Sequence, residues 1–126
     1  MKKYKFIVGF LAFGLIYSCA TNPFTGKSTL NLVSNASLFP SAFQQYDSFL
    51  KENKVVSGTQ DAKNVELVGT KIKNAAQLWL SSLGQAKYLE GYQWEYKLVQ
   101  DKAVNAWCMP GGKIVIYTGI LPITKD

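Results

Sequence analysis

The sequence predicts an α+β domain in which two amphipathic helices precede a small antiparallel β-meander. Apolar residues recur at helical spacing in two stretches before residue 84. After residue 92 the pattern changes to period-two alternation and then to a short apolar run that follows a Pro-Gly-Gly turn. A chain of 126 residues is long enough for one domain of this kind.

The N-terminus carries the pattern of an export signal rather than of a folded element. Three lysines precede an apolar run of twelve residues at 6–17. Twelve helical residues extend about 18 Å, well short of the ~30 Å hydrocarbon core of a bilayer, which suits a signal peptide better than a membrane span. The run ends in Ile16-Tyr17-Ser18-Cys19, which resembles a bacterial lipobox with an unusually bulky Tyr17.

We therefore predict a lipoprotein signal peptide over residues 1–18 and lipid attachment at Cys19. An ordinary cleaved signal peptide with an unrelated cysteine is the alternative. Residues 19–36 are rich in Ser, Thr and Asn and are predicted to form a tether, which leaves residues 37–126 for the folded domain.

The first predicted helix covers residues 38–50, with Ser37 as its cap and Pro40 in its first turn. Its apolar residues recur at intervals of four, three and four: Phe39, Phe43, Tyr46 and Leu50. The second predicted helix starts at Asp61 as its N-cap and ends at Leu83, with Gly84 at the C′ position. One stripe of this helix is expected to pack on the sheet: Val65, Val68, Ile72, Ala75 or Ala76, Trp79 and Leu83.

Three strands are predicted to follow and to pair in chain order as an antiparallel meander. Residues 93–100 alternate between two faces, which indicates a half-buried strand: Trp94, Tyr96 and Leu98 point one way, and Gln93, Glu95, Lys97 and Val99 the other. Residues 105–109 form the next strand, and a turn of Pro110, Gly111 and Gly112 reverses the chain into residues 113–118. Because this last strand is apolar on both faces, we expect it to be central or covered.

The charge distribution argues against a nucleic-acid partner. Three of the 14 lysines precede Cys19, so 11 lysines and eight acidic residues remain after it, a net charge of +3. These lysines are scattered, and the sequence has no arginine to make bidentate contacts with phosphates or bases.

No catalytic residue or metal ligand can be assigned within this chain. A catalytic zinc ion takes three protein ligands, and the sequence offers eight carboxylates, Cys108 and no histidine, without a close set on one face. We expect Cys108 to be a buried small hydrophobe rather than a reactive thiol, because no histidine could act as its base. Glu90 and Glu95 are expected to be solvated charges.

The stretch from Asn105 to Leu121 resembles the strand pair that precedes the catalytic helix in the HtpX-like zinc metallopeptidases. This family includes periplasmic lipoproteins and the β-barrel assembly-enhancing protease. The segment 22–27, the helix at 61–83 and the segment 122–126, which is similar to the entry to the catalytic helix, extend the resemblance. In the family a helix with His-Glu-x-x-His follows, so the resemblance implies an N-terminal portion that ends before its zinc ligands. Zinc is then expected in the full-length family and not in this chain.

The resemblance also places Asn105, Ala106 and Trp107 on an edge strand that pairs with extended substrate, main chain to main chain. The family usually has Phe or Tyr where Trp107 stands. In the alternative, which is equally open, Trp107 is a core residue and Asn105 forms hydrogen bonds at the strand end.

Two functions are compatible with these observations. The resemblance implies the N-terminal portion of a lipid-anchored zinc metalloendopeptidase, with membrane and polypeptide substrates as its partners. Such a peptidase would act in protein quality control in the bacterial cell envelope. It would be located on the periplasmic side of the outer membrane. Without histidine, this chain is not expected to be active alone. The alternative is a non-enzymatic envelope lipoprotein whose sheet binds extended or misfolded polypeptide segments.

Overall fold

The computed structural model describes residues 19–22, 25–30 and 33–124, and the chain divides into two compact units, residues 1–34 and 35–126. The signal peptide expected at 1–18 lies outside the described residues. In the first unit, strand β1 (Cys19–Thr21) pairs antiparallel with β2 (Ser28–Leu30). The N–H of Gly26, at φ +66°, donates to the Asn22 carbonyl at 2.9 Å and closes the turn. The predicted tether therefore contains a short hairpin.

In the second unit, helix α2 (Asn35–Glu52) begins two residues before the predicted cap, so Pro40 lies inside the helix rather than in its first turn. Its buried face carries Phe39, Ala42 and Tyr46, at the spacing of one helical stripe. The predicted periodicity of this helix is thus largely confirmed, with Phe43 and Leu50 half-buried beside the stripe.

Helix α3 (Gln60–Ser82) has the predicted length, but its N-cap is Thr59 instead of Asp61, since the Ala62 N–H donates to Thr59 Oγ1 at 3.1 Å. The prediction for its C-terminus is confirmed. Gly84 has φ +68°, its N–H donates to the Ser81 carbonyl, and the N–H of Gln85 donates to the Leu80 carbonyl. These two bonds form a Schellman motif, which favours glycine at this position.

The face that α3 presents to the sheet differs from the predicted stripe. Its buried residues are Ala62, Gly69 and Leu80, whereas several residues of the predicted stripe are exposed: Val68, Ile72, Trp79 and Leu83. The physical reason is the ring of Tyr96, which lies where a Cβ on Gly69 would be. The small residues of α3 let the helix approach this ring closely, and the large apolar residues are rotated away from the sheet.

The sheet is mixed, with the strand order β3-β4-β6-β5. Its strands are β3 (Val55–Val56), β4 (Glu95–Val99), β5 (Ala106–Met109) and β6 (Lys113–Tyr117). Two short 3₁₀ helices are also present: η1 (Ala86–Leu89) lies between α3 and β4, and η2 (Thr118–Ile120) follows β6. The α+β class is confirmed, and so is the central position of β6. The predicted meander was wrong in one respect, because β6 pairs with β4 in parallel and separates it from β5.

The connection from β4 to β5 explains this strand order. It crosses the end of β6, where Thr118 Oγ1 donates to the Asp101 carbonyl at 2.9 Å and the Gly119 N–H donates to the same carbonyl at 2.8 Å. The chain then returns antiparallel along the far side of β6. Local sequence patterns carry no information about such a crossing, because it depends on contacts between residues far apart in the chain.

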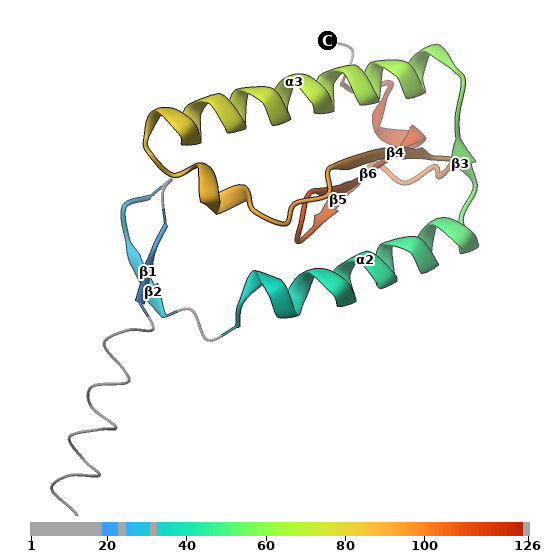
Figure 1. Ribbon diagram of the computed structural model, residues 1–126. Helices are drawn as coiled ribbons and strands as arrows, with labels where there is room; N and C mark the ends of the chain where they lie inside the picture. The colour runs from blue at the N-terminus through green and yellow to red at the C-terminus, as the bar shows by residue number, and fades with distance from the viewer. Residues whose placement is uncertain (1–18, 23–24, 31–32, 125–126) are drawn as a thin grey trace, which may run out of the picture. The chain divides into compact units, whose positions relative to one another are not determined.

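The two helices cover opposite faces of the sheet (Figure 1). On the α2 face, Tyr46 packs with Val99 and Val115 in a fully buried cluster. On the other face, Tyr96 lies against Gly69 of α3, and Leu98 is buried. Successive residues of a strand point to opposite faces, so β4 contributes Val99 to one core and Leu98 to the other.

Candidate substrate-binding edge strand

Strand β5 forms one edge of the sheet and pairs only with β6 among the described strands. The Tyr117 N–H donates to the Asn105 carbonyl at 3.1 Å, just before β5 begins. Hydrogen-bonded and non-hydrogen-bonded pairs alternate along an antiparallel ladder. The main-chain N–H and C=O groups of Ala106 and Cys108 therefore point away from β6, toward the open edge.

The side chain of Trp107 belongs to the core under α2. Its indole Nε1 donates to the Tyr117 hydroxyl at 3.1 Å, and its ring meets Phe49 edge-on at 4.8 Å between centroids. Tyr46 makes a second edge-on contact, at 6.3 Å. Trp107 thus holds β5 in place through its side chain, and the groups that β5 offers at the edge are those of its backbone.

The prediction that Cys108 is buried was wrong, since this residue is exposed. Along β5 the exposed residues Ala106 and Cys108 alternate with the half-buried Trp107 and Met109. The two large side chains occupy the α2 face, which places Cys108 on the opposite face. There α3 packs on β4.

The turn of Pro110, Gly111 and Gly112 joins β5 to β6, as the sequence suggests. Gly111 and Gly112 have φ values of +86° and +85°, which side chains with a Cβ rarely adopt. A Cβ on Gly111 would meet the ring of Phe43, and one on Gly112 would meet Trp94. The carbonyls of the two glycines accept the N–H groups of Gln93 and Glu95, at 2.8 and 3.0 Å. The turn therefore also fixes where β4 begins.

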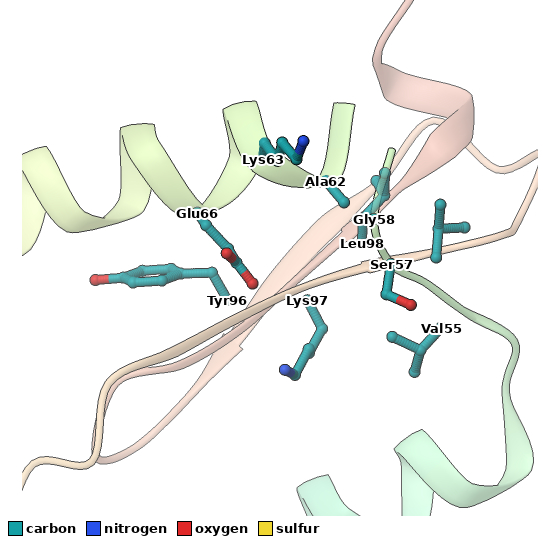
Figure 2. A pocket seen from close by; sticks show the side chains of 10 residues that line it. Val55, Ser57, Gly58, Ala62, Lys63, Glu66, Tyr96, Lys97 and Leu98 are labelled. Atoms are coloured by element: carbon teal, nitrogen blue, oxygen red, sulfur yellow. The ribbon is translucent and has the colours of Figure 1, made fainter. Parts of the chain in front are cut away.

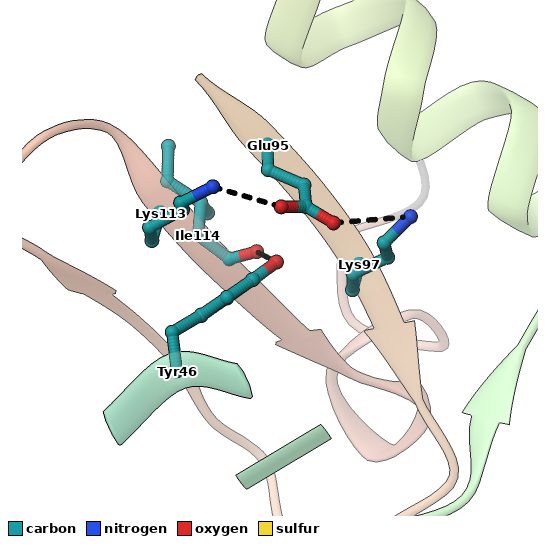
Figure 3. A network of polar contacts seen from close by, with 5 residues as sticks. All are labelled: Tyr46, Glu95, Lys97, Lys113 and Ile114. Atoms are coloured by element: carbon teal, nitrogen blue, oxygen red, sulfur yellow. Dashed lines mark hydrogen bonds and ion pairs between the residues drawn. The ribbon is translucent and has the colours of Figure 1, made fainter. Parts of the chain in front are cut away.

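A partly buried ion pair joins β4 to β6 on the α2 face of the sheet (Figure 3). Lys113 Nζ lies 2.9 Å from Glu95 Oε2, and Lys97 Nζ lies 3.3 Å from the other oxygen of the carboxylate. The Lys113 ammonium also stands 5.0 Å from the centroid of the Phe43 ring and 5.4 Å from that of Tyr46. The prediction of a solvated charge was wrong for Glu95, whose side chain is two-thirds covered.

The pKa shifts of Glu95 and Tyr46 are consistent with a structural role for both residues. Burial alone would raise the pKa of Glu95, but the hydrogen bond and charge of Lys113, followed by those of Lys97, outweigh it and lower the pKa. Burial raises the pKa of the Tyr46 phenol, and the charges of Glu95 and Asp47 add to this shift. The phenol therefore stays neutral, and it donates a long bond of 3.5 Å to the Ile114 carbonyl.

Sequence reasoning missed the pairing of Glu95 with Lys113. The available signal was an acidic residue at the start of one predicted strand and a basic residue at the start of another. Recognising the pair requires the parallel register between β4 and β6, which only the folded sheet provides.

A small cavity of about 70 Å³ lies between the first turns of α3, strand β3 and strand β4 (Figure 2). Lys63, Glu66 and Lys97 are among the residues that line it. Figure 2 shows that Lys97 projects to the side of the strand away from Glu66, so these charged groups do not converge on one point.

The described residues also do not fit a zinc ion. Nowhere in residues 19–22, 25–30 and 33–124 do three side chains of His, Cys, Asp or Glu come together in a group that could hold a metal. Cys108 is a free and exposed cysteine, and Glu95 already has two lysine partners.

Comparison with known proteins gives a local relation to metallopeptidases. The chain is 53% identical over 34 residues to mitochondrial metalloendopeptidase OMA1 of Arabidopsis thaliana, a stretch that covers 27% of this chain and 7% of the plant protein. It is 42% identical over 33 residues to mitochondrial metalloendopeptidase OMA1 of Schizosaccharomyces pombe, covering 26% of this chain and 10% of the yeast protein.

No family model matches the chain, and no solved structure matches it. The matched stretches span a tenth or less of the two relatives.

Proposed function

We propose that this chain is the N-terminal portion of a membrane-anchored zinc metalloendopeptidase that acts in protein quality control of a bacterial cell envelope. The observation that supports the proposal most is the local similarity to two metalloendopeptidases, combined with an open edge strand in the same chain. The zinc ligands would come from a segment of the full-length protein outside these 126 residues, and the residues present here would bind and orient the substrate.

The proposed substrate site is the edge of β5. An extended polypeptide can add a strand there, because Ala106 and Cys108 offer outward main-chain N–H and C=O groups. Main-chain pairing holds a polypeptide in a fixed register and accepts many side-chain sequences. Such tolerance suits an enzyme or binding protein whose clients are varied or misfolded.

A proline substitution at the edge tests this role directly. Cys108→Pro removes an outward N–H without removing a donor from the ladder with β6, whereas Cys108→Ala keeps the N–H and changes only the exposed side chain. Binding of a fluorescein-labelled, permanently unfolded polypeptide should fall about tenfold in Cys108→Pro and stay unchanged in Cys108→Ala. Circular dichroism checks that both variants are folded. Equal binding by the two folded variants would remove β5 from the proposal.

The proposed membrane attachment uses Cys19. The short apolar run at 6–17 and the lipobox-like sequence before the cysteine support it, and the proposed location is the periplasmic side of the outer membrane. Metabolic labelling with a fatty-acid analogue should mark the wild-type protein and leave Cys19→Ala unlabelled. Labelling of both proteins to the same extent would exclude Cys19 as the attachment site.

A second candidate function is a non-enzymatic envelope lipoprotein that binds extended or misfolded segments through the same edge. It rests on the same open edge of β5, which can pair with an extended segment without any catalytic group. The coding DNA beyond Asp126 separates the two candidates. A His-Glu-x-x-His sequence within roughly the next twenty codons supports the peptidase, since this motif places two zinc ligands and the general base on one helix.

A further inference from the structure

Helix α3 exposes a large apolar surface on the side that does not face the sheet. Five large apolar residues of α3 and Leu83 at its C-cap are between 42% and 73% exposed; those in the helix are Leu67, Val68, Ile72, Leu78 and Trp79. At about 100° per residue, four of them fall within about 60° of the helix circumference: Val68, Ile72, Trp79 and Leu83. We call these six residues the α3 stripe. An apolar surface of this extent marks a docking site more often than it occurs by chance.

The packing of α3 maintains this exposure. The helix approaches β4 through Ala62 and Gly69, and the ring of Tyr96 occupies the space next to Gly69. Turning the α3 stripe toward the sheet would drive larger side chains into that ring. The α3 stripe is therefore directed away from the sheet by the same contact that positions the helix.

The charges around the α3 stripe indicate what it binds. Between Glu66 and Glu90 the sequence contains three lysines, at 71, 73 and 87, and no acidic residue, which gives this segment a charge of +3. Two exposed aromatic residues, Trp79 and Tyr88, lie in the same segment. Of these residues, Lys71, Lys73 and Trp79 lie on α3, and Lys87 and Tyr88 lie on η1, which follows it. Exposed apolar residues with flanking lysines and aromatic rings form the pattern of a segment that lies in a membrane interface and favours anionic lipids.

We infer that the α3 stripe docks on the surface of an anionic lipid bilayer, with the helix parallel to the membrane. Among the described residues, no helix is both long enough and apolar enough to cross a membrane. The interfacial orientation does not require this, because the apolar side enters only the boundary between headgroups and acyl chains.

A second copy of this chain is a less suitable occupant. Antiparallel pairing of two α3 helices would bring two segments 67–89 of +3 charge side by side, with only Asp61 and Glu66 of each helix to pair with the lysines. An anionic bilayer neutralises the same lysines. The charge of the segment therefore favours lipid over self-association.

This site is independent of acylation at Cys19, although it would reinforce the membrane attachment under the proposed function. A single lipid chain binds membranes only marginally, and a second, electrostatic or apolar contact makes the attachment stable. The experiment therefore uses the full chain with Cys19→Ala, so that failure of acylation and failure of the α3 stripe are distinguished.

The first measurement locates Trp79 relative to the membrane. The protein is mixed with vesicles of phosphatidylcholine and phosphatidylglycerol whose acyl chains carry bromine, a quencher of tryptophan emission. Trp79 is 42% exposed, whereas Trp94 and Trp107 are half-buried in the protein. Bromine should quench the wild-type emission and should quench Trp79→Phe much less. Equal quenching of the two proteins would place the membrane contact elsewhere and overturn the inference.

The second measurement compares two pairs of matched substitutions. Ile72→Gln with Leu78→Gln alters the α3 stripe, and Val104→Gln with Ile123→Gln alters two residues of similar exposure outside α3. The stripe pair should weaken vesicle binding about tenfold, and the control pair should leave it unchanged. The apolar run at 6–17 is the same in both, so it cannot produce a difference.

Two further outcomes would overturn the inference. Equal binding to vesicles of phosphatidylcholine alone, with no decrease at high salt, would remove the role of anionic lipid. A dimer on gel filtration that the stripe pair dissociates, together with weak vesicle binding, would assign the α3 stripe to a second copy. Circular dichroism of each variant confirms that the comparison is made on folded protein.

Discussion

Glu95 and Lys113 face each other directly across the parallel strands β4 and β6, and their side chains form an ion pair of 2.9 Å. Lys113 is 7% exposed, so its charge has little access to water. If one partner is removed, the charge of the other is left buried without compensation. The resulting loss in the free energy of unfolding is larger than the net stabilisation that the intact pair provides. The pair therefore favours the observed register of the two central strands over one in which Lys113 would lie opposite another residue.

Loss of the carboxylate should destabilise the protein clearly. Glu95→Gln leaves the buried Lys113 ammonium without a counter-charge, and we expect the free energy of unfolding to fall by about 3 kcal/mol. Urea denaturation followed by circular dichroism measures the change. Glu90→Gln, at an exposed position, is the matched control and should change stability by less than about 0.5 kcal/mol. Similar effects of both substitutions would mean that the ion pair is not a structural determinant.

The same carboxylate predicts how stability depends on pH. The pKa of Glu95 is lower in the folded protein than its usual value of about 4.3. A lowered folded pKa adds stability that is fully present above the unfolded value and is lost as the pH falls through the folded value. Thermal unfolding between about pH 5 and pH 3 should show this loss in the wild type and a shallower dependence in Glu95→Gln. Parallel pH profiles would contradict the prediction.

Adding one methyl group at Gly69 should be harmful even though alanine favours helices. The new Cβ would collide with the ring of Tyr96, so Gly69→Ala should lower stability by about 1–3 kcal/mol despite a helix-propensity gain of about 1 kcal/mol. Chemical denaturation measures this change. In the double variant Gly69→Ala with Tyr96→Leu the ring is absent. Its loss of stability should therefore be smaller than the sum of the losses in the two single variants. Simple additivity would show that the two residues do not interact.

Removing the hydroxyl of Tyr96, in contrast, should not destabilise the protein. This atom is buried without a hydrogen-bond partner among the described residues, and burial raises the pKa of the phenol. Removing an unsatisfied buried hydroxyl relieves its desolvation penalty, so Tyr96→Phe should leave stability unchanged or raise it by about 1 kcal/mol. Tyr117→Phe is a suitable control, because the Tyr117 hydroxyl accepts a bond from Trp107. A clear loss of stability in Tyr96→Phe would show that the hydroxyl has a hydrogen-bond partner.

Much of the local structure could be predicted from the sequence. The end of α3 at Gly84, the turn at Gly111 and Gly112, and the expectation that β6 is central or covered were confirmed. Each of these depends on a short-range property: the conformational freedom of glycine, the spacing of apolar residues, or a strand that is apolar on both faces. The edge role of Asn105, Ala106 and Trp107 came from a family resemblance, and polypeptide binding there stays a prediction.

The tertiary structure decided which surfaces meet. The apolar residues of α3 that the sequence predicts on the sheet are largely exposed, because the helix packs on Tyr96 through Gly69. Cys108 is exposed because Trp107 and Met109 occupy the α2 face. The parallel pairing of β4 with β6 likewise brings Glu95 to Lys113. Sequence periodicity identifies an apolar face but not its partner, because the partner is set by contacts between residues distant in the chain and by how closely their side chains can approach.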